Sequence, residues 1–405
     1  MSNPAKTAQP VATSPAQTAG QVNKAILSLS LAGLFIGTGE FASMSLLPGL
    51  ADSTSVSIPT AGRYISAYAL GVVVGAPLIA ILTAGWPRKQ LLIMLIGLFA
   101  IGYTASAIAW NQPSLLVARF VAGLPHGAYY GVACLVAAAL AGADRKAQAA
   151  GYVMAGLAAA NVIGVPAATW LGQTFGWRSA FAVLGASGIA MMLLFWRCLP
   201  SVMKRSGSHR SSELRGLRSP HIWLTLATAS VGFGGMFAVY SYITPTLTEV
   251  GGFTESQVPS ILMLWGLGMV AGNLIGGWLA DRQLVRTLFA IMVWNVIVLG
   301  LFSVFAGTPT AALAVLFLIG CGFALVPALQ VYLMTIAGKA QTLAAALNHS
   351  AFNISNAIGA SLGGLAISSG YGWASTGWIG SVLALIGIGL MGMTVWVRHI
   401  TRDSE

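Results

Sequence analysis

The feature that most constrains this chain is a series of apolar runs that are each long enough to cross a lipid bilayer. A helix needs about 20 residues to span the hydrocarbon core, and runs of that length recur throughout the sequence. We find twelve, at about 25–48, 61–82, 90–110, 113–137, 148–172, 179–199, 222–246, 257–279, 285–305, 309–335, 341–367 and 374–397. Only 7% of the 405 residues are charged, whereas soluble domains carry about 25%. The sequence therefore predicts an all-α polytopic membrane protein.

The net charge of +11 reflects membrane topology rather than a nucleic-acid partner. If both termini are cytoplasmic, as an even number of spans allows, seventeen of the twenty Lys and Arg residues fall on the cytoplasmic side. Arg63 and Arg178 fall outside, and Arg119 lies within a span. Lys and Arg are enriched in cytoplasmic loops because they set orientation during insertion. We therefore expect a multi-pass protein in a lipid bilayer with both termini cytoplasmic and no nucleic-acid partner.

The chain repeats itself at an offset of 197 residues. The pairs that coincide at this offset are Gly37 with Gly234, Pro48 with Pro245, Gly71 with Gly268, Gly75 with Gly272, and Gly123 with Gly320. Repetition at a fixed period indicates duplicated structural units. We expect two six-helix bundles at residues 25–199 and 222–397, joined by a basic, Ser-rich cytoplasmic linker at 200–221. Residues 1–24 are predicted to form a disordered cytoplasmic tail, and 398–405 a second cytoplasmic tail.

An even number of spans in each half gives both halves the same orientation. Parallel six-span repeats form a transporter architecture in which the substrate site lies between the halves, near the middle of the bilayer. Transport in this architecture occurs by rocking of one half against the other. The duplicated sequence therefore favours a transporter with one central site. Because each chain contains both halves of the pathway, we expect a monomer.

Several segments resemble the major facilitator superfamily. "GTGEFASMSLLPGLA" in span 1, "ISAYALGVVVGAP" in span 2, "ARFVAGLPHGAYYGVA" in span 4 and "LNHSAFNISNAIGASLGG" in span 11 match this pattern. They are similar to the twelve-span drug:proton antiporter branch and, within it, to the arabinose-efflux-permease-like group. The resemblance covers roughly residues 22–400. It implies a transporter of the bacterial inner membrane that exchanges a small molecule for protons.

The same resemblance implies roles for two further segments. In span 5, "AANVIGVPAATWLGQTFGWRSAF" resembles the antiporter motif, with Val165 between Gly164 and Pro166. After span 8, "GGWLADRQLVR" keeps the Asp281 and Arg282 of the family's cytoplasmic gate. The corresponding loop after span 2 has Ala84 and Gly85 where the family has Asp and Arg. The resemblance therefore implies a charged gate in the second half only.

Within the spans, ionisable side chains are rare and are candidates for function, because burying a charge in a membrane is costly. Glu40 lies ~12 Å and Arg119 ~9 Å from the outer end of their spans at 1.5 Å per residue. At matching depths, the two could share one wall of a cavity. Burial disfavours the charged carboxylate and a nearby Arg favours it, so Glu40 and Arg119 are predicted to couple proton binding to transport. The alternatives are a permanent Glu40–Arg119 ion pair, or an Arg119 that satisfies only helix carbonyls.

Two histidines also share a depth, ~20 Å from the outside for His126 and ~18 Å for His349. Either could relay protons or bind a polar substrate, although buried histidines commonly serve helix packing. Other polar or aromatic candidates for a central substrate cavity are Tyr129, Tyr130, Asn161, Tyr240, Tyr242, Asn353 and Asn356. As a set they suit an amphipathic small molecule better than a multiply charged one. Each could instead be a packing residue.

Enzyme signatures and cofactor sites are missing from the sequence. It has neither a phosphate-binding Gly-x4-Gly-Lys-[Ser/Thr] loop nor a His-Glu-x2-His metal motif. Cys134, Cys198 and Cys321 lack metal-ligand spacing and are interpreted as packing residues. We therefore expect no enzyme activity and no cofactor or metal. The first hypothesis is proton-coupled export of a drug, sugar or nucleoside. An importer or uniporter, and a receptor or scaffold without transport, are the alternatives.

Overall fold

The computed structural model describes residues 18–83, 86–141, 145–200, 219–337 and 341–403. All regular elements in these ranges are helical. Ten segments of the described chain are long and apolar enough to cross a membrane. One of them, Glu255–Phe305, has 51 residues and is long enough for two crossings, and Gln341–Ala366 adds another helix of spanning length. The expected architecture of twelve transmembrane helices is confirmed.

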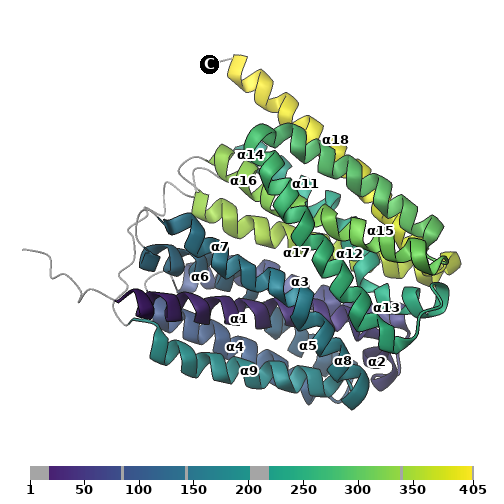
Figure 1. Cartoon of the computed structure of the whole chain (residues 1–405), viewed down its shortest axis with the longest axis horizontal. Helices are drawn as coiled ribbons and strands as arrows, with labels where there is room; N and C mark the ends of the chain where they lie inside the picture. Colours follow the sequence, from purple (N-terminus) through teal and green to yellow (C-terminus); the bar gives the residue numbers. More distant parts are fainter. Residues whose placement is uncertain (1–17, 84–85, 142–144, 201–218, 338–340, 404–405) are drawn as a thin grey trace, which may run out of the picture.

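The first half of the chain contributes six spans. They are α1 (Ala19–Ser45), α3 (Ile58–Leu82), α4 (Arg88–Ala107), α5 (Gln112–Gly123) with α6 (His126–Ala141), α7 (Lys146–Ala159) with the π-helix η2 (Ala160–Gly164) and α8 (Val165–Phe175), and α9 (Trp177–Cys198). A short helix, α2 (Leu47–Ser53), follows the first span. Figure 1 shows these helices side by side as one group.

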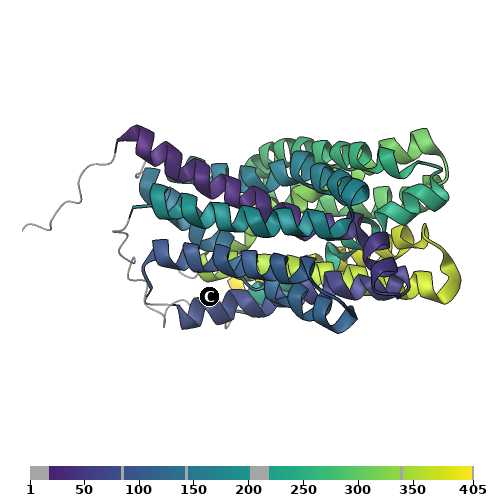
Figure 2. The ribbon, with the colours of Figure 1, turned by 90° about the horizontal axis from the view of Figure 1, so that it is seen from below.

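The second half contributes six more spans. They are α11 (Pro220–Gly232) with α12 (Gly234–Ser241), α14 (Val258–Phe305), which contains two, α15 (Pro309–Cys321) with η5 (Gly322–Ala324) and α16 (Leu325–Ala337), α17 (Gln341–Ala366), and α18 (Ser375–Asp403). Shorter elements are α13 (Ile243–Pro245), η3 (Thr246–Val250), η4 (Glu255–Gln257) and η7 (Ile367–Tyr371). Figures 1 and 2 show this second group packed along the first.

Several predicted boundaries move in the structure. Helix α1 begins at Ala19, so residues 19–24 of the predicted tail are helical, because Thr18 and Gln21 form a capping box. Helix α18 likewise continues through residues 398–403 of the second predicted tail. Residues 1–17, 201–218 and 404–405 of the predicted tails and linker lie outside the described residues. The gap predicted between spans 8 and 9 is a break at Gln283, whose φ of −147° and ψ of 70° are not helical.

The internal repeat is visible in the close approach of paired helices. A methyl group added at Gly71 would overlap the carbonyl oxygen of Phe120, and one added at Gly268 would overlap that of Phe317. Gly75 and Gly272 bear the same relation to the carbonyl oxygens of residues 124 and 321. In each half, small residues let the second span of the bundle touch the backbone of the fourth. Paired glycines that are 197 positions apart therefore make equivalent contacts in the two halves, as well as being identical in sequence.

The surface of the bundle is apolar along its length and basic at one end. Large side chains such as Leu274, Ile163 and Leu193 are exposed, as expected where helices face lipid. We call the end where α1 begins the basic face, because the element ends and the helix break that gather there carry Lys and Arg (Figure 1). Lys24 lies near the start of α1, Lys89 near the start of α4 and Arg145 just before α7, and Arg282 and Arg286 flank the break in α14. Lys89 donates to the carbonyl oxygens of Trp196 and Leu199 and so caps α9. The other end, where α1 stops at Ser45, is the opposite face.

Candidate functional site

A cavity of about 390 Å³ lies between the two halves. Its polar lining consists of Glu40, His126, Asn161, Asn273, Gln330, His349 and Asn353. Its apolar lining includes Phe41, Met154, Leu157, Phe233, Phe237, Met269, Phe323, Val326, Met334 and Phe352. The volume is in the range of small-molecule sites, which are mostly apolar with a few convergent polar groups. The cavity is the candidate substrate site.

The cavity extends toward the basic face and is closed toward the opposite face. Its lining includes Gly277 and Met334, near the basic ends of their spans, and Val331, which is 51% exposed. At the opposite face, Thr244 of α13 donates to the carbonyl oxygen of Ser45 at 2.7 Å. Nearby, Phe41 of α1 stacks on Phe237 of α12 with ring centroids 6.2 Å apart.

These contacts join the halves at the closed end of the cavity, and a loop contact adds to them. Gln173 at the end of α8 donates to the carbonyl oxygen of Glu255 at 2.9 Å. Both residues belong to the opposite face, and they come from different halves of the chain. The structure therefore represents a state that is accessible from the basic face.

Glu40 lies on the cavity wall with only 6% of its surface exposed. Its Oε2 is 3.6 Å from Nε2 of His126. The amide of Asn356 on α17 approaches the carboxylate from the other half without forming a hydrogen bond of ordinary geometry. The carboxylate thus stands where both halves meet, with a titratable imidazole beside it and open cavity in front.

Arg119 does not line the cavity or pair with Glu40, which corrects the predicted shared wall. It is fully buried behind α1 and donates to the Ser43 hydroxyl at 2.9 Å and the Tyr103 hydroxyl at 3.3 Å. Its guanidinium lies 4.6 Å from the ring centroid of Tyr68. Ser43 in turn donates to the carbonyl oxygen of Glu40. Arg119 therefore contacts Glu40 only indirectly, through Ser43 on α1, and its buried Nε has no partner among the described residues.

The two histidines come together from opposite halves, with Tyr130 between them. His126 is the first residue of α6, directly after the break at residues 124–125 in span 4, and its Nδ1 is 2.9 Å from the Tyr68 hydroxyl. The Tyr130 ring lies 5.2 Å from the His126 ring and stacks on the His349 ring at 5.7 Å. Both histidines also line the cavity, as the sequence predicted.

The four predicted cavity tyrosines do not line the cavity. Tyr129 and Tyr130 donate to the carbonyl oxygens of Leu29 and Gly33 and so tie α6 to α1. Tyr240 packs behind Phe41, at 5.4 Å between ring centroids. Tyr242 fills a glycine-lined slot between α3 and α17 and donates to the carbonyl oxygen of Ala360. A buried phenol needs a partner, and backbone carbonyls supply it for Tyr129, Tyr130 and Tyr242.

The segment that resembles the antiporter motif lies where α1 and α14 both pack on span 5. Gly164 ends the π-helix η2, and a methyl group there would overlap Oγ1 of Thr38 on α1. Pro166 is buried near the start of α8, where the wider π turn precedes it. On the other side, Gly266 of α14 touches the backbone at Asn161. The motif therefore forms a contact between the halves, at the edge of the cavity.

The two charged residues of the predicted cytoplasmic gate, Asp281 and Arg282, do not pair with each other in the described structure. Arg282 places its guanidinium 3.7 Å from the ring centroid of Trp278, its neighbour on α14. Asp281 is exposed and makes no ion pair with any other residue in the described ranges. The break at Gln283 follows directly, and Arg286 donates to the Gln283 side chain. An unpaired gate agrees with a cavity that opens toward the basic face.

Sequence reasoning missed most of the apolar lining and two polar residues, Asn273 and Gln330. Both are uncharged polar residues inside apolar runs, a signal like the one that selected Asn161 and Asn353. The phenylalanines could not be recognised, because a membrane span contains many and only packing shows which ones face a cavity. Among the described residues, no group of three His, Cys, Asp or Glu side chains could hold a metal ion.

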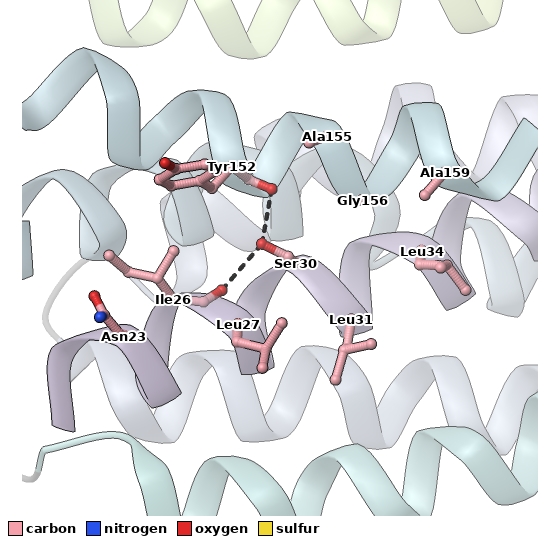
Figure 3. A pocket seen from close by; sticks show the side chains of 10 residues that line it. All are labelled: Asn23, Ile26, Leu27, Ser30, Leu31, Leu34, Tyr152, Ala155, Gly156 and Ala159. Carbon is pink, nitrogen blue, oxygen red and sulfur yellow. Dashed lines mark hydrogen bonds between the residues drawn. The ribbon is translucent and has the colours of Figure 1, made fainter. Parts of the chain in front are cut away.

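A second hollow of about 480 Å³ lies between α1 and α7 near the basic face. Figure 3 shows Ile26, Leu27, Leu31 and Leu34 along one side, and Ser30 donating to the carbonyl oxygens of Ile26 and Tyr152. It contains no acid, base or histidine. The central cavity, with Glu40 and two histidines, is therefore the stronger candidate for transport chemistry.

A sequence profile of the Major Facilitator Superfamily matches residues 29–341. The chain belongs to this superfamily. Its relatives are transporters and not enzymes, so this member of the superfamily is a multi-pass membrane transporter of small molecules. Similar proteins include the inner membrane transport protein YdhP of Escherichia coli K12, which is 37% identical over 92% of this chain and 96% of that protein. AraJ of the same organism is 36% identical over 86% and 89%.

A further superfamily relative is named for resistance to a drug. The chloramphenicol resistance protein of Streptomyces lividans is 30% identical over 82% of this chain and 86% of that protein. Among solved structures, a bacterial homolog of the human lysosomal transporter Spinster, in an inward-facing and occupied conformation, has a TM-score of 0.75. It is 15% identical over 94% of this chain and 98% of that chain, which supports the fold alone.

Proposed function

We propose that this protein is a proton-coupled exporter of a small amphipathic molecule, working by alternating access in a bacterial inner membrane. The observation that carries the proposal is Glu40, a carboxylate buried on the wall of the central cavity and 3.6 Å from His126. An acid inside a membrane protein is costly and typically serves ion or substrate movement. Its position between the halves gives it the opportunity to sense both substrate and conformation.

The coupling follows from competition for one cavity. Protonated, Glu40 is neutral and can remain in a closed, apolar cavity while the halves rock. Ionised, it favours a state in which water or a substrate with hydrogen-bond donors reaches it. A proton entering from the opposite face and leaving at the basic face would then drive substrate the other way. The segment that resembles the antiporter motif would keep the halves in contact through its backbone at Asn161, with Gly164 and Pro166 shaping span 5 against α1, and Asp281 with Arg282 would close the gate.

The direction of export requires that the basic face be cytoplasmic, with both termini there, as the positive-inside rule predicts. A membrane-impermeant maleimide tests this orientation. Thr308→Cys at the opposite face should react in intact cells, whereas Gln90→Cys at the basic face should react only after lysis. Both positions are exposed. Reaction of Gln90→Cys in intact cells would reverse the proposed direction.

Drug, sugar and nucleoside classes all remain within the proposed substrate range. The apolar lining and the absence of Lys and Arg among the described lining residues support an amphipathic molecule over an anion. The drug-resistance name of the Streptomyces relative supports export. An importer or uniporter on the same fold is the competing function, and the transport assay below separates the two.

The decisive experiment uses proteoliposomes with an imposed pH gradient. Wild-type protein should accumulate substrate against its gradient, and Glu40→Gln should abolish this accumulation while counterflow exchange continues, because the cavity is intact but cannot release a proton. Asp52→Asn, at an exposed acid at the end of α2 on the opposite face, is the matched control. Equal accumulation by Glu40→Gln and wild type would exclude Glu40 from coupling. Transport that is indifferent to pH would favour a uniporter.

A further inference from the structure

We propose that the central cavity selects molecules that carry at least two O–H or N–H donors, and that the amide oxygens of Asn161 and Asn353 accept them. The inference rests on the proposed function, since it takes this cavity as the substrate site. It goes further because it assigns two recognition residues, one from each half, and a chemical property that the substrate must have.

The orientation of both amides is fixed by their own helices. The Asn161 side-chain nitrogen donates to the carbonyl oxygen of Leu157 at 3.1 Å, and that of Asn353 donates to the carbonyl oxygen of His349 at 3.0 Å. In each case the acceptor is four residues earlier, and a carbonyl oxygen can only accept. Turning either amide over would place two oxygens against each other. The nitrogen therefore points to the backbone and the oxygen must point away.

Both amide oxygens are buried and without a partner among the described residues. The side chains belong to residues that are 1% and 4% exposed, and both line the cavity. A buried acceptor without a donor is costly, and such groups in native structures require an explanation. Asn161 also lies in the π-helix η2, a type of element that is frequent at functional sites. Each oxygen exposes almost no surface to water, so a ligand donor in the cavity reaches it through a small movement of the neighbouring side chains and then satisfies it.

The surroundings narrow the chemistry further. Asn273 offers a third unpartnered amide oxygen on α14, and Glu40 is a fourth acceptor. Phe41, Phe237 and Phe352 supply flat apolar surface in the same cavity. A wall of acceptors beside aromatic rings fits an uncharged or cationic molecule that has a ring and several hydroxyl, amide or amine hydrogens. It rejects an analogue of the same shape whose donors are capped.

The test compares matched pairs of probes on purified protein. Phenyl glucoside, chloramphenicol and uridine each carry several donors, and their fully methylated counterparts keep the ring but lose the donors. Binding is measured by calorimetry and thermal stabilisation in detergent at one pH. At least one parent compound should bind about tenfold or more tightly than its methylated counterpart. Equal binding within every pair, or no binding by any parent, overturns the proposal.

Two variants locate the effect. Asn161→Leu and Asn353→Leu should each weaken the parent about tenfold and leave the methylated counterpart unchanged, so that the difference within the pair disappears. Asn348→Leu is the control, because Asn348 is a buried asparagine on the same helix as Asn353, also has an unpartnered amide oxygen, and does not line the cavity. Asn161→Ala and Asn353→Ala replace any leucine variant that does not fold. Retained discrimination in both variants overturns the assignment.

Failure of this inference is distinguishable from failure of the proposed function. Binding in detergent involves no gradient, so it is independent of proton coupling. Donor-dependent binding without proton-driven transport would leave the inference standing and remove the exporter. Proton-driven transport of a parent and its methylated counterpart at equal rates would support the exporter and overturn the inference.

Discussion

Arg119 shows how a buried charge can exist in a membrane protein without an acidic partner. Its two terminal nitrogens each donate to a hydroxyl, its Nε has no partner among the described residues, and its guanidinium lies within 5.5 Å of the ring centroids of Tyr68, Tyr103 and Phe181. A planar guanidinium group can stack on aromatic faces and donate to two acceptors at once in a fixed geometry. A lysine ammonium is not planar and does not stack in this way. The arginine thereby ties span 4 to α1 next to Glu40.

We predict that Arg119→Lys destabilises the protein, whereas the same substitution at an exposed arginine does not. The variant keeps the charge but loses stacking and one of two charge-assisted hydrogen bonds, so its melting temperature in detergent should fall by about 5 °C or more. Arg63→Lys, at an exposed position, should leave it unchanged. An unaltered melting temperature for Arg119→Lys would show that the aromatic rings and hydroxyls around Arg119 contribute little to stability.

The sequence predicted the acid and the two histidines that line the cavity, because such groups are costly to bury in a membrane. Its prediction that four tyrosines line the cavity was wrong. Glu40, His126 and His349 were predicted at the cavity because ionisable groups inside apolar runs demand a polar or aqueous environment. The tyrosines were misplaced because a phenol satisfies its hydroxyl equally well on a helix carbonyl as on a substrate. Asn161 and Asn353 were predicted at the cavity, but their free oxygens were not, since only the folded helix shows which amide atom is already bonded.

At the level of elements, span 5 combines a π-helix with a glycine and a proline. The π turn leaves room for Pro166, which cannot donate to the preceding turn. Gly164 lies against Thr38, which donates to the carbonyl oxygen of Leu34 within α1. The motif thus fixes how closely span 5 and α1 approach.

We predict that Gly164→Ala separates α1 from span 5 and that the loss can be repaired. The added methyl group overlaps Thr38 Oγ1, and overpacking of this kind costs about 1–3 kcal/mol. Melting temperature and transport rate should both fall, and Thr38→Ala should restore them by removing the hydroxyl. Gly151→Ala, on the same span with nothing within 4 Å, should be silent. Additive losses in the double variant would contradict the contact.

At the level of the whole molecule, the halves touch at the opposite face and part at the basic face. Ser45, Thr244, Gln173 and Glu255 make the contacts, while the described part of the gate around Asp281 is unpaired. Interfaces of this kind have discrete arrangements, so closure at one face accompanies opening at the other. Transport requires the contacts at the opposite face to break in every cycle.

We therefore predict that cross-linking the opposite face arrests transport without preventing binding. Gln173→Cys with Glu255→Cys, in a background with Cys134, Cys198 and Cys321 replaced by Ser, should lose flux after treatment with a short bifunctional thiol reagent. Substrate binding from the basic face should persist, and a cleavable reagent should allow recovery on reduction. Each single cysteine variant is the control. Undiminished flux in the cross-linked protein would mean that these contacts do not separate during transport.

The sequence by itself determined the number of spans, the duplication and the presence of a buried acid, because length, period and the cost of burying charge are local properties of a chain in lipid. It also predicted the positions of the glycines that repeat at the 197-residue offset, and these make backbone contacts because only small residues allow two helix backbones to meet. The tertiary structure decided which face of each helix meets the cavity, that Asp281 and Arg282 are not paired with each other, and that Arg119 lies behind Glu40. Those outcomes depend on the rotation and tilt of twelve packed helices. The sequence of an apolar span in lipid does not specify either quantity.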